Sequence, residues 1–346
     1  MREVVKLNVE RLITVAKKEF FDQVSGRKFL ILFAMLVIIA GVSVISEVQT
    51  YNNELESYAN SGSTYIDENG VMHYGGAMYN PSPVNIYYGI VSGLGGYIFG
   101  PLIAIAAGFN LITKERESGS IKSVLSHPLY RDELINGKAI GGIAALSFAT
   151  VGLFVIVTAS LLLLSIVPSM DDFISISGLC AVTIIFLTGI FAMALMVSSL
   201  TKNSGTSLIY SLILFFIFTY IASIIAPSVS ILILGPEPSS VDNNGFGFAN
   251  LEEERKYYTN QKMIENTIEY LSIKNNYYTI GTALTKPSFF WAFKGADEFQ
   301  FLDYSQMGID FDDIFGKIWG NLLILIAYPV VFFGIAYVRF MRMDLR

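Results

Sequence analysis

Six long apolar runs divide this chain of 346 residues, and none of the six contains Lys, Arg, Asp or Glu. A helix that crosses a bilayer needs about 20 predominantly apolar residues. Only 15% of the residues are charged, whereas a soluble domain usually has about 25%. The sequence therefore predicts an all-α polytopic membrane protein with six transmembrane helices. The predicted spans are Phe29–Ser46, Val84–Ile112, Ala139–Val167, Phe173–Leu200, Ser207–Ile225 and Ile318–Val338.

The distribution of Lys and Arg between these runs predicts the orientation of the chain. Residues 1–28 contain seven of them, residues 113–138 contain five and residues 339–346 contain three, whereas residues 47–83 contain none. An excess of Lys and Arg marks cytoplasmic loops. We therefore expect a multi-pass protein of the plasma membrane with both termini and residues 113–138 in the cytoplasm. Residues 47–83 are then an extracytoplasmic loop, and residues 226–317 form a sizeable extracytoplasmic domain in which Leu251–Asn275 is predicted to be helical.

The composition of the spans argues against several classes of protein. Ionisable groups inside membrane helices usually mark proton relays, ion sites or voltage sensors. Their absence argues against a carrier coupled to protons or sodium and against an intramembrane metalloprotease. His73 and His127 lie outside the spans and lack the spacing of metal ligands. We therefore predict no catalytic, metal-binding or cofactor-binding residue, and no nucleic-acid partner.

The segment Lys114–Lys138 concentrates nine charged residues between the second and third spans. Residues 114–117 are predicted to carry the second helix past the headgroups, and residues 118–120 to end it. Ile121, Val124 and Leu125 then form one apolar face of a short helix, which Pro128 ends.

A new helix is predicted to begin at Arg131, because Asp132 and Glu133 suit the positive N-terminal end of a helix. The side chain of Lys138 is expected to snorkel toward the interface at the start of the third span. The spacing alone leaves two interpretations open. The segment is either a mechanical element suspended between two spans or an ordinary charged loop.

Nine positions in this segment and beside it match one family pattern in register. They are Glu115, Glu117, Gly119, Ser126, Pro128, Arg131, Glu133, Gly137 and Lys138. With these residues the segment resembles the loop after the second span of type-2 ABC transporter permeases, although Ser120 stands where Thr is usual. Residues 16–28 are similar to the opening of the same family. The resemblance implies that residues 1–28 form an amphipathic helix along the inner interface.

The resemblance also implies that the loop carries a coupling helix, which docks on a cytoplasmic ATPase. Ile121–Ser126 would be this helix, with Glu115, Glu117 and Arg131 as its polar supports. The full set of implied ATPase-coupling residues is Glu115, Glu117, Gly119, Ile121, Val124, Leu125, Pro128, Arg131, Glu133, Gly137 and Lys138.

The nucleotide-binding motif itself is missing from the sequence. A phosphate-binding loop has the pattern G-x-x-x-x-G-K-[ST]. The Gly137–Lys138 pair has Asp132 at the first Gly position and Ala139 after the Lys. We therefore expect no enzyme activity from this chain alone. ATP and Mg²⁺ would be bound by separate ABC ATPase subunits, and no cofactor by this chain.

Two functions from different classes remain after these exclusions. The first is a permease that forms a substrate path with a second permease copy, identical or related. The family resemblance implies that the direction of transport is export. The second is a non-transport membrane anchor or sensor. Its outer domain binds an extracytoplasmic partner and is moved by the ATPase. An ion channel has less support, because the spans show no ring of polar pore residues beyond scattered Ser, Thr and Asn110.

Overall fold

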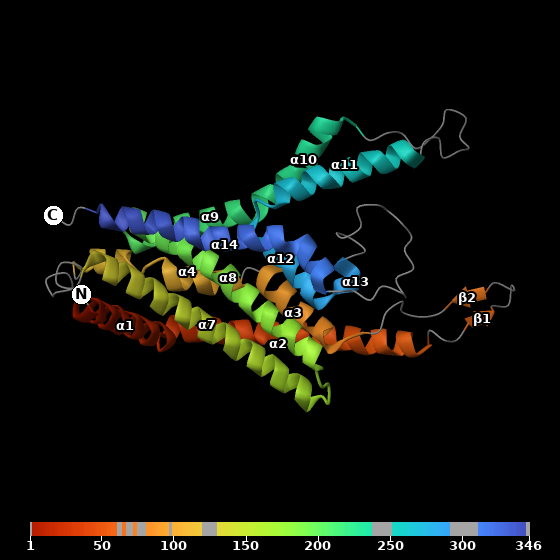
Figure 1. Ribbon diagram of the computed structural model, residues 1–346, viewed down its shortest axis with the longest axis horizontal. Helices are drawn as coiled ribbons and strands as arrows, with labels where there is room; N and C mark the ends of the chain where they lie inside the picture. Colours follow the sequence, from red (N-terminus) through yellow and green to blue (C-terminus); the bar gives the residue numbers. More distant parts are fainter. Residues whose placement is uncertain are drawn as a thin grey trace.

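The computed structural model describes residues 2–60, 64–66, 72–74, 81–96, 99–119, 130–236, 251–290 and 311–343. This part of the chain is almost entirely helical (Figure 1). The elements before residue 120 are α1 (Arg2–Val24), α2 (Arg27–Asn60), β1 (Thr64–Ile66), β2 (Met72–Tyr74), η1 (Pro83–Tyr87), α3 (Tyr88–Val91), η2 (Ser92–Gly96), α4 (Phe99–Gly108) and α5 (Thr113–Glu117). The later ones are α7 (Arg131–Leu163), α8 (Met170–Leu200), α9 (Ser204–Phe216), η3 (Ile217–Ile221), α10 (Ala222–Leu234), α11 (Leu251–Glu269), α12 (Ile273–Thr285), α13 (Pro287–Phe290) and α14 (Phe311–Met341).

The all-helical prediction holds except for a short hairpin, in which β1 pairs with β2 in antiparallel register from Thr64–Tyr74 to Ile66–Met72. Within the described residues, five helices are long and apolar enough to cross a membrane. The count rises to six when Pro83–Leu94 and Phe99–Glu117, which meet at an angle of 56°, form one span. The predicted number of spans is therefore reached only if the second span is broken.

Helix α8 lies at the centre of the bundle and packs against α4, α7, α9, α12 and α14. In its most apolar stretch 72% of the residues are buried, against 22% for α2 and for α14. A capping box fixes its beginning, because the Ser169 backbone N–H donates to Asp172 Oδ2 at 2.8 Å and the Asp172 N–H donates to Ser169 Oγ at 3.2 Å. The central helix thus starts where Pro168 ends the preceding connection.

Small residues allow the broken second span to pack closely on its neighbours. A Cβ on Gly89 would lie 3.0 Å from the Ser43 backbone of α2, and one on Gly108 would lie 2.8 Å from the Phe191 carbonyl of α8. Such small residues let membrane helices approach at backbone distance. The second span therefore packs closely between α2 and α8.

The fifth span is longer than predicted and is not a regular helix. It runs from α9 through the π-helical turn η3 into α10, which contains Pro227 and ends at Leu234. The last part of this span, α10, packs against α11, and the two helices project together away from the bundle (Figure 1). π-Helical turns in α-helices frequently mark functional sites.

The predicted helix Leu251–Asn275 is divided at residues 270–272, because α11 ends at Glu269 and α12 begins at Ile273. Ser272 caps α12 by accepting a hydrogen bond from the Asn275 N–H at 3.2 Å. Helix α12 does not stand apart from the spans. Its Ile273 side chain lies 3.0 Å from the position of a Cβ on Gly189, near the middle of α8.

Polar side chains hold α12 in this place. Asn321 of α14 donates to the Asn276 side chain at 2.9 Å, and the Thr183 and Tyr277 hydroxyls are 3.1 Å apart. Part of the segment predicted as an outer domain therefore packs inside the bundle.

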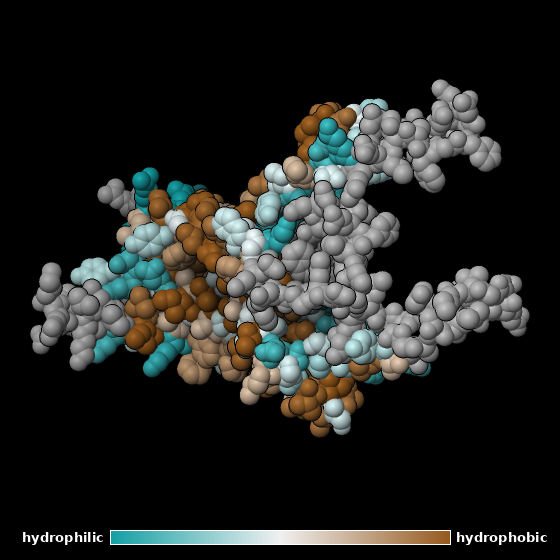
Figure 2. Space-filling view, turned by 45° about the vertical axis from the view of Figure 1, so that its right-hand side comes forward, coloured by the Kyte–Doolittle hydropathy of each residue, from teal (hydrophilic) through white to brown (hydrophobic). Residues whose placement is uncertain are grey.

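The surface matches a membrane environment. Apolar residues, coloured brown in Figure 2, cover much of the middle of the visible face, and hydrophilic residues lie at its left end and again beside the grey residues. Both termini lie at the same end of the bundle (Figure 1).

Candidate functional site

The charged segment between the second and third spans has two described stems, which are α5 on one side and the beginning of α7 on the other. Four of the predicted coupling residues, Ile121, Val124, Leu125 and Pro128, lie outside the described residues, as does Ser126. The docking helix therefore stays a prediction. The stems show how the segment is attached to the rest of the protein.

The first stem is bonded to the connection between α8 and α9. Glu117 accepts hydrogen bonds from the Ser204 backbone N–H and from the Ser204 hydroxyl, both at 2.7 Å. Arg116 donates to the Thr201 carbonyl at 3.3 Å. Glu117 lies beyond the apolar run that ends at Ile112, and the two bonds from Ser204 lower the pKa of its carboxyl. As predicted, the helix ends at Glu117, and Gly119 follows with φ +67°, a conformation that favours glycine.

The second stem is bonded to the C-terminal end of the chain. The Tyr130 N–H donates to Glu133 Oε2 at 3.0 Å, which confirms that a helix begins at Arg131 with an acidic first turn. Arg131 Nη1 donates to the Met343 carbonyl at 2.8 Å and to the Met341 carbonyl at 3.3 Å. A cation suits the free carbonyls at the end of α14. Arg131 thus joins the start of α7 to the end of α14.

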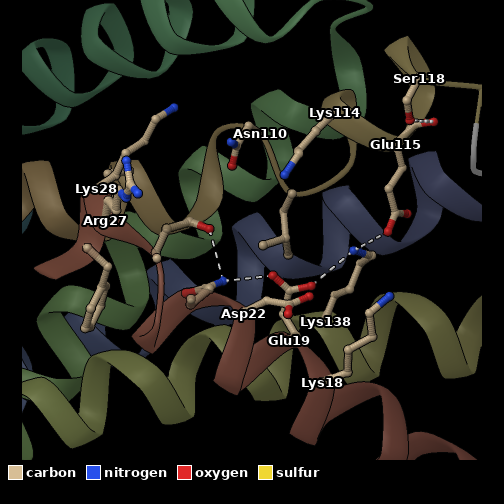
Figure 3. Close-up of a pocket in the computed structure, with 16 residues that line it drawn as sticks. Lys18, Glu19, Asp22, Arg27, Lys28, Asn110, Lys114, Glu115, Ser118 and Lys138 are labelled. Atoms are coloured by element: carbon tan, nitrogen blue, oxygen red, sulfur yellow. Dashed lines mark hydrogen bonds and ion pairs between the residues drawn. The ribbon is translucent and has the colours of Figure 1, made fainter.

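Lys138 connects the two stems and the N-terminal helix. Its ammonium lies 2.8 Å from Glu115 Oε1 and 3.2 Å from Glu19 Oε2 (Figure 3). The expectation that Lys138 snorkels was wrong, because its side chain is only 8% exposed. Burying a cation is costly unless a carboxylate compensates it. Here two carboxylates do so, and Gln23 supports one of them by donating to Glu19 at 3.2 Å.

Helix α1 lies directly on the start of α7. A Cβ on Gly137 would lie 2.7 Å from the Val15 side chain, and one on Gly141 would lie 2.6 Å from the Ala16 carbonyl. The two glycines are four residues apart and so lie on one face of α7. Gly137 therefore allows α1 to pack closely on the start of α7.

A cavity of about 410 Å³ opens beside the ion cluster, between α1, the start of α2, the α4–α5 connection and the start of α7. In Figure 3, Arg27 and Lys28 lie on one side of it and Lys114 on the other, with Asn110 between them. The cavity also receives Lys18, Asp22 and the ion cluster.

The structure thus distributes the predicted site residues over several contacts. Glu115 and Lys138 meet directly, whereas Glu117 and Arg131 bind α9 and the end of α14. The sequence analysis missed Glu19 and Ser204, which complete these contacts. Glu19 is one of four acidic residues among residues 1–28, so no local signal in the sequence distinguished it.

Comparison with known families identifies the family of the chain. A family model described as "ABC-2 family transporter protein" matches residues 13–345, which is nearly the whole chain. No curated protein matches the chain. The match includes all the apolar helices and both stems of the charged segment. The chain therefore belongs to the ABC-2 family of transporter proteins, as a multi-pass membrane component of an ABC transporter in the plasma membrane.

Proposed function

We propose that this chain is a permease subunit that couples ATP hydrolysis by separate ABC ATPase subunits to the export of a substrate, through residues 113–138. Family membership implies the ATPase partner. The observation that carries the coupling role is the attachment of the two stems to different helices, by Glu117 to α9 and by Arg131 to the end of α14.

This attachment supports transmission of a displacement. A segment that bonds to one neighbour moves that neighbour alone. Here α5 is bonded to the α8–α9 connection, α7 is bonded to the end of α14, and Lys138 joins both stems to α1. An ATPase that moves residues 113–138 would therefore shift the equilibrium between two arrangements of several helices at once. It does so only if it binds the two arrangements with different affinity.

The proposal includes a second permease copy that packs against this one. Helices α2 and α14 bury only 22% of their most apolar stretches within the described part of the chain. Lipid or a second copy would cover the remaining apolar surface. A substrate path between two copies agrees with the type-2 permease resemblance, and export is the direction that this resemblance favours.

The coupling role can be tested with the full chain purified from its membranes together with any bound ATPase. Glu117→Ala removes the bonds to Ser204, and Arg131→Ala removes those to the end of α14. Each variant is expected to lower the ATP hydrolysis of the reconstituted complex several-fold. Asp171→Asn, at the opposite end of α8, is the matched control and should leave hydrolysis unchanged.

Unchanged association and unchanged hydrolysis in both variants would show that the coupling role is wrong. Transport is measured separately as ATP-dependent flux in proteoliposomes. Hydrolysis without flux, in a complex whose ATPase responds to a partner added on the outer side, would instead favour the anchor or sensor function.

A further inference from the structure

The cavity beside the ion cluster has an excess of positive charge that the coupling role does not use. Lys18, Arg27, Lys28, Lys114 and Lys138 line it, together with Glu19, Asp22 and Glu115. Glu19 and Glu115 are already paired with Lys138. Within the described part of the chain, the other four cations have no ion-pair partner. They share one cavity with the single remaining carboxylate, that of Asp22, so an anion in this space would reduce their mutual repulsion.

The cations come from separate elements, so their convergence is a property of the fold. Lys18 belongs to α1, Arg27 and Lys28 open α2, and Lys114 belongs to α5. Lys28 lies 6.0 Å from the ring centroid of Phe109, which is a weak partner for a cation. Figure 3 shows Lys114 reaching into the space between the α1 side and Asn110.

Two further polar groups indicate a ligand that both accepts and donates hydrogen bonds. The buried Gln23 Oε1 has no partner, although the Gln23 amide nitrogen donates to Glu19 and to the Ala107 carbonyl. A buried acceptor without a donor costs free energy. A ligand hydroxyl would supply the missing donor, and the Asn110 amide on the cavity wall offers donors to an anion.

The position of the cavity favours a membrane lipid as the source of such a ligand. Arg27 and Lys28 are the last charges before the first apolar run, and Lys114 is the first after the second run. The cavity therefore lies at the level of the headgroups. Close to it along the chain, Phe21, Leu30 and Ile31 are 62%, 51% and 61% exposed. Basic pockets between membrane helices on the cytoplasmic side bind anionic headgroups.

We propose that this cavity binds the headgroup of an anionic glycerophospholipid, with its phosphate among Arg27, Lys28 and Lys114 and a headgroup hydroxyl near Gln23. The exposed apolar residues at the start of α2 then contact the acyl chains. Arg27, Lys28 and Lys114 are not among the proposed coupling residues, so the lipid site can be present even if the proposed transport function is wrong.

The experiment compares lipids on the purified full chain in detergent. Phosphatidylglycerol and phosphatidylcholine are added separately, and the midpoint of thermal unfolding is followed against lipid concentration. We expect saturable stabilisation by phosphatidylglycerol at concentrations at which phosphatidylcholine has no effect. Equal stabilisation by the two lipids would overturn the proposal.

Variants locate the site. Each cation near an anionic headgroup contributes roughly fivefold in affinity, so Arg27→Gln/Lys28→Gln/Lys114→Gln should weaken phosphatidylglycerol binding about 100-fold. The control is Lys17→Gln/Lys202→Gln/Arg339→Gln, which removes the same charge from exposed positions outside the cavity. Lys114→Gln alone should weaken binding about fivefold. This single variant tests the site if the triple variant does not fold. Equal losses in the cavity and control variants would contradict the assignment.

A third arm separates the lipid from a soluble phosphate compound. Glycerol 3-phosphate and inorganic phosphate are titrated in place of the lipid. Both are expected to bind far more weakly, because they lack acyl chains. Stabilisation by either compound at the concentrations effective for phosphatidylglycerol, with the same dependence on Lys114, would overturn the lipid assignment.

Discussion

The environment of Lys138 in the structure differs from the one that its position in the sequence predicts. In the sequence it stands at the edge of an apolar run, where a snorkelling side chain is the ordinary expectation. In the structure it is buried between Glu19 and Glu115, which come from two other helices. A buried pair of this kind adds little net stability, but removal of one member leaves an uncompensated charge.

At this residue scale we predict that Lys138→Met destabilises the protein by about 3 kcal/mol, because two partly buried carboxylates lose their cation. The measurement is the unfolding midpoint of the purified protein in detergent. The triple variant Glu19→Gln/Glu115→Gln/Lys138→Met should recover most of this loss, since no unpaired charge remains. Lys202→Met, which removes an exposed cation, is the control. A midpoint equal to that of the control would contradict the pairing.

At the scale of elements, the contact between α1 and α7 depends on the absence of side chains at two positions. Helix α1 approaches α7 so closely at Gly137 and Gly141 that a methyl group meets backbone atoms or a Cβ atom. The spacing of the two glycines was visible in the sequence, but the sequence did not show which helix would lie against them. The partner is the N-terminal helix of the same chain.

We predict that Gly141→Ala destabilises the protein by about 1–3 kcal/mol, because the new Cβ would lie 2.6 Å from the Ala16 carbonyl and 2.7 Å from the Glu19 Cβ. Gly152→Ala on the same helix is the matched control, since its nearest neighbour, Phe33 Cζ, is 3.8 Å away. That control should be neutral or gain up to about 1 kcal/mol from higher helix propensity. The unfolding midpoints of both variants provide the test, and equal values would argue against close packing at Gly141.

At the scale of the whole molecule, the extension of α2 is tied to α12. Lys286 lies 2.9 Å from Glu47 and 4.7 Å from the ring centroid of Tyr88. The Tyr88 hydroxyl in turn hydrogen-bonds the Tyr278 hydroxyl. These contacts connect the first predicted outer segment with the large one, and they lie away from the end that holds the two termini (Figure 1).

We predict that Lys286→Met costs more stability than Glu47→Gln, because it removes the ion pair and the contact with the Tyr88 ring together. The loss for Glu47→Gln should be about 1.5 kcal/mol, as for a hydrogen bond between charged groups. The charge-swapped pair Glu47→Lys/Lys286→Glu should be more stable than either single reversal. A double variant no better than the single ones would show that the two side chains act independently.

The sequence predicted the features that depend on local chemistry. The apolar runs became helices, the acidic first turn began α7 at Arg131, and Ser118–Gly119 ended α5. Features that depend on distant partners were not accessible. Glu19 meets Lys138 across 119 positions of sequence, and no local pattern encodes that contact. Residues 226–317 were predicted as one outer domain because the stretch is long and hydrophilic, and its composition did not reveal that Asn276 and Tyr277 of α12 are hydrogen-bonded to α14 and α8.

Helix α12 has a consequence for biogenesis. Its 13 residues span only about 20 Å, which is too short to cross a hydrocarbon core of about 30 Å. Its polar side chains would also be unsatisfied in lipid alone. Its hydrogen bonds from Tyr277 and Asn276 form only when α8 and α14 are in place, and α14 follows α12 in the chain. We therefore expect α12 to be buried only after α14 has been synthesised, so the folding of this short helix depends on a segment that follows it in the chain.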